Sequence, residues 1–184
     1  MFLFSFLTFK SYSYQQTTCL CSPYLLQNLP THRSKICISN TIKQLNAFSY
    51  PNQIVISYNL TKLLNKEEII AVIEHEVNHI KKHHHLILIF LTSLQITLYL
   101  FLIFLIFKII FSSFNVLKFF FICFLFLFIN IFTIIEKKQM EFEADKVIHK
   151  KELISALLKI GFYSDEFYKI RPFITERIKR IAKD

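Results

Sequence analysis

The sequence has a single glycine, Gly161, no tryptophan, and few acidic residues: 13 Asp and Glu stand against 22 Lys and Arg. Motifs that rely on glycine for a turn are therefore poor guides in this chain. No basic stretch with interleaved aromatic residues occurs outside the long apolar segment, so we expect no nucleic-acid partner. The net charge of +9 instead fits the anionic surface of an inner membrane leaflet.

The cysteine pattern and the N-terminus also lack familiar signals. The four cysteines do not form the C-x-x-C spacing of zinc ribbons and redox motifs. Residues 2–9 are apolar, but they lack a basic flank and are too short to span a bilayer, which argues against a signal peptide. We expect residues 1–34 to be an N-terminal segment, either lying at a membrane interface or left from a longer N-terminal region.

Charge is nearly absent between Leu86 and Ile135, where Lys108 and Lys118 are the only charged residues. Residues 86–107 would form a helix about 33 Å long, and a bilayer core is about 30 Å thick. Residues 117–135 would form a second such helix. The sequence therefore predicts a transmembrane hairpin over residues 86–135 and a lipid bilayer as partner.

Lysines gather on the two flanks of this hairpin rather than in its loop. The flanking lysines are Lys81, Lys82, Lys137, Lys138, Lys146, Lys150 and Lys151. Because positive residues favour the cytoplasmic side, we expect a multi-pass protein of the cell membrane with both flanks in the cytoplasm.

The remaining chain divides around the hairpin. Residues 35–85 should hold two half-buried strands, Ile36–Ser39 and Gln53–Tyr58, and an amphipathic helix from Leu63 to His84. Residues 136–184 should hold a helix from Glu136 to about Ile160 and a final helix after Pro172. We expect Gly161 to cap the first of these two helices.

The helix from Leu63 to His84 carries the main chemical signal, His75-Glu76-Val77-Asn78-His79. In this H-E-x-x-H spacing, His75 and His79 lie one turn apart on one face, so both imidazoles can bind a single zinc ion. Glu76 then lies beside the metal and can act as a general base. Asn65 and Glu68 resemble a capping box, which supports the helix.

A catalytic zinc ion usually has three protein ligands, and three candidates compete for the third place. His85 has the spacing of the last histidine in the longer H-E-x-x-H-x-x-G-x-x-H pattern, but Lys82 replaces the glycine of its turn. His83 lies on the correct face but one turn further on. Glu141 and Asp145 follow the hairpin, which returns the chain to the side it left. We favour Glu141 as ligand and Asp145 as a hydrogen-bond acceptor for a ligating imidazole.

At this point the sequence resembles the HtpX-type integral-membrane zinc metallopeptidases, a family that includes the CAAX prenyl endopeptidases. The matching blocks are Asn46-Ala47-Phe48, Ile54-Val55-Ile56-Ser57 with Leu60, Glu68–Ile80, the E-x-x-A-D block Glu141–Asp145, and Pro172 with Glu176-Arg177-Ile178. The resemblance implies one zinc ion held by His75, His79 and Glu141. It also implies Glu76 as general base and Asp145 as the partner of a ligand.

The same resemblance implies a mainly α membrane protein, with a gluzincin-like minidomain on the two-helix hairpin. An edge strand near Gln53–Tyr58 would bind an extended substrate, with Asn46, Ile54 and Ile56 as substrate-strand residues. Arg171 replaces the family's histidine before Pro172. It could stabilise an oxyanion, but it cannot exchange a proton as histidine does.

These features predict a membrane zinc endopeptidase that cleaves membrane or misfolded proteins at the cytoplasmic face. Two alternatives remain open. One is a BlaR-type sensor peptidase, against which the Asn46-Ala47-Phe48 block and the absence of an extracytoplasmic sensor domain argue. The other is a catalytically silent membrane scaffold that uses zinc only for structure.

Overall fold

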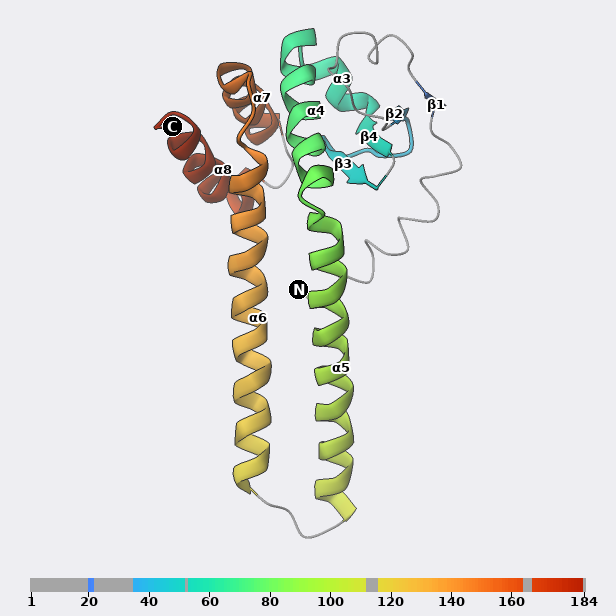
Figure 1. The fold of residues 1–184 in the computed structure, drawn as a ribbon, viewed down its shortest axis with the longest axis vertical. Coiled ribbons are helices and arrows are strands. Elements are labelled where there is room, and N and C mark those ends of the chain that lie inside the picture. The colour runs from blue at the N-terminus through green and yellow to red at the C-terminus, as the bar shows by residue number, and fades with distance from the viewer. Residues whose placement is uncertain (1–19, 22–34, 52, 112–115, 164–166, 184) are drawn as a thin grey trace. The chain divides into compact units, whose positions relative to one another are not determined.

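The computed structural model describes residues 20–21, 35–51, 53–111, 116–163 and 167–183. The chain forms two compact units. The first combines Met1–His83 with Glu141–Asp184, and the second is His84–Met140. Figure 1 shows the elements of both units.

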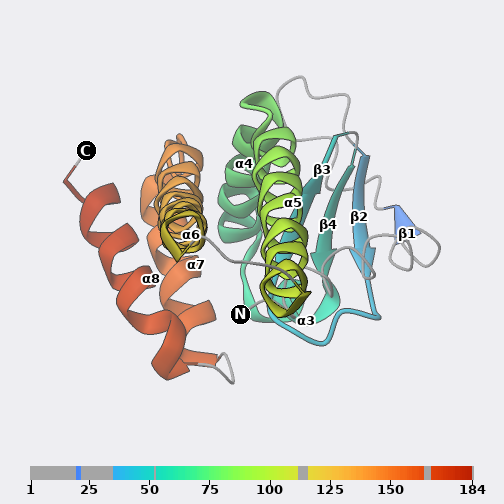
Figure 2. The same cartoon turned by 90° about the horizontal axis from the view of Figure 1, so that it is seen from below.

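The first unit contains a four-stranded sheet with the order β1-β2-β4-β3. The strands are β1 (Leu20–Cys21), β2 (Lys35–Ser39), β3 (Ala47–Tyr50) and β4 (Gln53–Ser57). β2 and β4 are parallel, and β3 is antiparallel to β4, with β3 nearest to α4 (Lys66–Lys81) (Figure 2). The two predicted strands are confirmed, while β1 and β3 had no clear signal in the sequence.

β4 is an inner strand, so the predicted edge strand near Gln53–Tyr58 is wrong. It lies between β2 and β3, and Ile54 and Ile56 are almost completely buried. Val55 between them is buried as well, so both faces of β4 are covered, and this short apolar run did not distinguish an edge strand from a central strand. Among the described strands, the edge beside α4 is β3.

The capping box that the sequence predicts is present at the start of α4. Asn65 accepts a hydrogen bond from the Glu68 backbone N–H, and Glu68 accepts one from the Asn65 N–H, both at 2.8 Å. This capping box starts α4 at Lys66 rather than at Leu63, which ends the separate short helix α3 (Tyr58–Leu63). His83 adopts a left-handed conformation with φ of 53°, so α4 ends at Lys81 and the predicted continuous helix to His84 is wrong.

The second unit consists of two long apolar helices, α5 (His84–Phe111) and most of α6 (Val116–Ala144). The segments His84–Lys108 and Phe119–Ala144 are long and apolar enough to cross a membrane. Gln95 of α5 donates hydrogen bonds to Thr133 (3.1 Å) and Asn130 (3.4 Å) of α6. These contacts join the two helices, which lie side by side (Figure 1).

The C-terminal helices differ in their bounds from the prediction. α6 continues to Ala144, a break follows, and α7 covers Lys150–Tyr163, so no single helix spans Glu136 to Ile160. The last helix, α8, covers Phe167–Ile181 and starts before Pro172. Gly161 lies inside α7 without a positive φ, so it is not a cap. A Cβ atom there would lie 3.2 Å from Ile174 Cδ1, which shows that Gly161 lets α7 and α8 pack closely.

One hydrophobic core joins the sheet to the helices of the first unit. Its best-buried side chains are Ile54, Ile56, Leu60, Ile73 and Leu153. α4 packs between β3 and α7, and α7 packs on α8. Because α4 is held from two sides, the side chains on its remaining face have fixed positions.

Candidate metal centre

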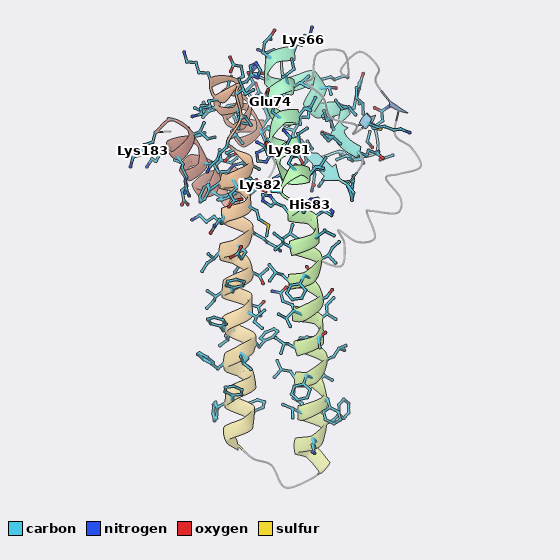
Figure 3. The ribbon with its side chains drawn as sticks, viewed as in Figure 1. Lys66, Glu74, Lys81, Lys82, His83 and Lys183 are labelled. Atoms are coloured by element: carbon cyan, nitrogen blue, oxygen red, sulfur yellow. The ribbon has the colours of Figure 1, made fainter. Side chains whose placement is uncertain are left out.

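Three predicted ligands converge within the first unit. His75 and His79 lie on α4, in the half that runs from Glu74 toward Lys81 (Figure 3), and Glu141 lies in the last turn of α6. One ligand atom from each residue lies within 4.8 Å of the other two. Within the described part of the chain, this is the one such group of three His, Cys, Asp or Glu residues, so neither His83 nor His85 belongs to a comparable cluster.

The spacing of these atoms fits a tetrahedral metal ion. The two histidine Nε2 atoms are 3.1 Å apart, and each is 3.5 Å from an oxygen of Glu141. Ligands placed 2.0–2.1 Å from a tetrahedral zinc ion are about 3.3 Å apart. Two neutral imidazoles and one carboxylate are also a usual ligand set for zinc in hydrolases. The residues present therefore fit a zinc ion.

Behind the ligands, Asp145 fixes the orientation of His75. The Nδ1 atom of His75 lies 3.0 Å from Asp145 Oδ1, which leaves Nε2 directed toward Glu141 and His79. A proton held on Nδ1 keeps the Nε2 lone pair available for a metal. The predicted contact between Asp145 and one of the two motif histidines is therefore present, and the role of His75 as a metal ligand stays a prediction.

Arg177 of α8 completes this group, although no role was predicted for it from the sequence. Its Nε and Nη2 atoms donate to the two oxygens of Asp145 at 2.8 and 2.5 Å, and its Nη1 lies 3.2 Å from Glu141. Arg177 is 8% exposed, so this is a buried ion pair with two parallel hydrogen bonds. The only available signal was its place in the Glu176-Arg177-Ile178 block.

The electrostatics of the centre favour a bound cation. Burial alone would lower the pKa of His75, but hydrogen bonds to Asp145 and Glu141 outweigh it and raise this pKa to about 9. For Asp145, burial opposes the charged form, while Arg177 and His75 hold its pKa below the usual range. The carboxylates that strengthen proton binding at His75 would equally stabilise a metal cation beside it.

Glu76 lies next to His75 and is nearly inaccessible to solvent, at 8% exposure. Burial raises its pKa, and the neighbouring His75 and, to a smaller extent, Ser49 of β3 partly offset this effect. A carboxylate with a raised pKa is a better proton acceptor, as a general base requires. The structure thus places the predicted base at the metal-binding face of α4, beside β3.

Two polar contacts tie the end of α6 to α4. The Asn78 side chain donates to the carbonyl oxygens of Ala144 and Lys146, both at 3.0 Å. Glu74 accepts from the backbone N–H of Ile148 (3.1 Å) and from His149 Nδ1 (2.9 Å). Together they hold the chain on both sides of Asp145, which explains why the helix stops at Ala144.

Two other predicted site residues, Arg171 and Asn46, lie in α8 and directly before β3. Arg171 lies in α8, but its side chain is outside the described residues. Asn46 directly precedes β3, and its backbone N–H donates to Ser57 Oγ at 3.2 Å. It is therefore placed at the start of the edge strand β3, next to Ser57 at the end of β4.

An H-E-x-x-H helix, a glutamate from a second helix and an oriented histidine define a metallopeptidase-type site. In agreement with this class, the model of peptidase family M48 matches residues 25–184, and the chain belongs to that family. The family consists of zinc metallopeptidases, so membership implies peptide or protein substrates. No curated protein matches the chain in sequence.

Proposed function

We propose that this protein is a zinc-dependent endopeptidase of the HtpX type, anchored in the cell membrane, which cleaves membrane or misfolded proteins at the cytoplasmic face. The convergence of His75, His79 and Glu141 at metal-binding distances carries this proposal. Membership of peptidase family M48 supports the reaction class.

In the proposed mechanism, His75, His79 and Glu141 would hold the zinc ion, which supplies Lewis acidity toward water and the scissile carbonyl. Glu76 accepts the proton of the attacking water, since its raised pKa increases its affinity for that proton. Glu76 then protonates the leaving amine. Asp145 and Arg177 keep the His75 ring in the orientation that leaves Nε2 free. We retain Arg171 as the candidate for oxyanion stabilisation.

We also propose that β3 binds the substrate as an added antiparallel or parallel strand. β3 pairs with β4 along one edge, and no described strand covers the other. An exposed strand edge offers backbone N–H and C=O groups to an extended peptide. The packing of β3 against α4 supports this role, because it brings Ser49 of the strand close enough to the proposed base Glu76 to affect its pKa.

The membrane location is supported by the exposure of the two apolar helices. In each of the segments His84–Lys108 and Phe119–Ala144, only 6% of the most apolar window is buried inside the protein. A soluble core helix would cover these side chains with protein, whereas a bilayer covers them with lipid. The lysines that flank both segments support the cytoplasmic placement of the metal centre.

The test compares wild type with Glu76→Gln in zinc-dependent cleavage of an unfolded polypeptide. Loss of a general base should lower the rate by about 10²–10⁴-fold while zinc stoichiometry stays the same. Glu67→Gln is the matched control, since Glu67 is an exposed residue of the same helix and should behave as wild type. Equal rates for wild type and Glu76→Gln would refute the mechanism and favour a silent zinc-binding scaffold.

A further inference from the structure

A cavity of about 280 Å³ lies within the first unit, beside the metal centre but outside its ligand set. It is formed by the last turn of α6, the segment that leads to α7, and the ends of α7 and α8. Three cationic side chains line it: Lys146, Lys150 and Arg180. We refer to it as the basic cavity.

Within the part of the chain that the structure describes, the positive charge of the basic cavity has no ion-pair partner. None of the described residues forms an ion pair with Lys146, Lys150 or Arg180. The single carboxylate in the lining, Asp145, already receives two hydrogen bonds from Arg177. Three like charges around one small volume repel each other, and an anion between them would remove that repulsion.

The position of Lys150 adds to this imbalance. Lys150 is the first residue of α7, where the helix dipole disfavours a cation. The backbone N–H groups of Ile148 and His149 just before it already donate to Glu74. The basic cavity therefore attracts an anion through side-chain charge rather than through the free N–H groups of a helix end.

The remaining residues of the lining are apolar, and one of them, Phe142, holds the Arg180 side chain in place. The Arg180 guanidinium lies 4.4 Å from the centre of the Phe142 ring, and stacking of this kind restricts its orientation. Val147 and Ile181, which complete the lining, are buried at 6% and 5% exposure. A fixed guanidinium and two lysines around an apolar floor suit a tetrahedral oxyanion better than a planar apolar ligand.

We propose that the basic cavity binds a phosphate group, either free or carried by a lipid headgroup. The bound group would hold the segment from Asp145 to Lys150 in place. Since Asp145 both lines this cavity and orients His75, occupancy would stabilise the metal centre from behind. This site is separate from the proposed peptidase reaction, and it can be tested without any measurement of cleavage.

The test measures binding to the full chain in detergent by isothermal titration calorimetry. The two probes are inorganic phosphate and a short-chain phosphatidylglycerol. Wild type should bind at least one probe, and the double variant Lys146→Gln/Lys150→Gln should bind it roughly tenfold more weakly. The control Lys151→Gln/Lys179→Gln removes the same charge from exposed positions outside the lining, and should stay within about twofold of wild type.

The two probes distinguish the source of the phosphate. Saturable binding of both identifies the phosphate group itself as the ligand, and binding of the lipid alone identifies a headgroup site. If the lysine double variant fails to fold, Arg180→Gln carries the same expectation. The proposal is overturned if wild type binds neither probe, or if the control variant loses as much affinity as the cavity variant.

Discussion

Replacement of Asp145 by asparagine should weaken metal binding without touching a metal ligand. Asp145 accepts hydrogen bonds from Arg177 at 2.8 and 2.5 Å and lies 3.0 Å from His75 Nδ1. Asparagine has nearly the same shape but only one acceptor oxygen, and its amide N–H₂ group must face a donor. At least one of the three contacts is therefore lost, and Arg177 keeps a buried charge without a full partner.

The expected magnitude follows from these contacts. Loss of a hydrogen-bond partner behind a ligating histidine typically lowers metal affinity about 10–100-fold, or about 1.4–2.7 kcal/mol. The breaking of a buried ion pair typically costs about 3–5 kcal/mol of unfolding free energy. Because asparagine can keep part of the hydrogen bonding, the stability loss should fall near the lower end of that range.

Competition with a chelator of known zinc affinity would measure the first quantity, and denaturant unfolding of the full chain would measure the second. Glu143→Gln is the matched control, because it also replaces a carboxylate by an amide, in the last turn of α6. Glu143 forms a surface ion pair with Lys82 at 2.8 Å, so zinc affinity should stay within about twofold when it is replaced. An unchanged zinc affinity in Asp145→Asn would refute the idea that Asp145 acts through His75.

Substitutions at three further positions test the fold. Burial opposes the charged form of Glu68, but hydrogen bonds from Lys159, Ser155 and Asn65 hold its pKa below 4.5. The contribution of this charge to the free energy of unfolding should therefore be complete above pH 4.5 and fade as the pH falls further. Glu68→Gln should lower the free energy of unfolding by about 2 kcal/mol at neutral pH and by less in acid. An equal loss at neutral and at acid pH would contradict the role of the Glu68 charge. Gly161→Ala should change stability by less than about 1 kcal/mol, since the 3.2 Å contact is with a flexible side-chain end, whereas Gly161→Val should lose about 1–3 kcal/mol in the same unfolding assay. Gln95→Leu should cost about 1 kcal/mol in detergent denaturation, and no loss would show that its contact with Thr133 contributes nothing.

The features that the sequence predicted well depend on residues close together in the chain. The capping box needs only Asn65 and Glu68, and its geometry appears at the predicted place. His75 and His79 share a face because the helical repeat fixes them there. Local hydrogen bonds and helix periodicity act over a few residues, so a pattern in the sequence is enough to locate them.

The features that were missed depend on distant contacts. α6 stops at Ala144 because Asn78 and Glu74 of another helix hold the following segment, and local helix propensity does not reveal that. Arg177 lies 102 residues from His75 in the chain, and in an amphipathic helix it looks like any solvated cation. The strand order, which moves the edge from β4 to β3, is likewise a result of pairing between separate segments.

The sequence by itself therefore determined the candidate site residues, which are the two histidines, the proposed base Glu76 and the carboxylates that follow the hairpin. It also determined the two helices that are apolar enough for a membrane. The tertiary structure alone decided which edge strand lies beside Glu76, that Arg177 holds Asp145 against His75, and that three cations surround one cavity. The physical reason is the separation along the chain of the residues that interact. Helix phase and hydrophobicity are written into neighbouring residues, whereas a buried ion pair or a cavity exists only when segments far apart in the chain pack together.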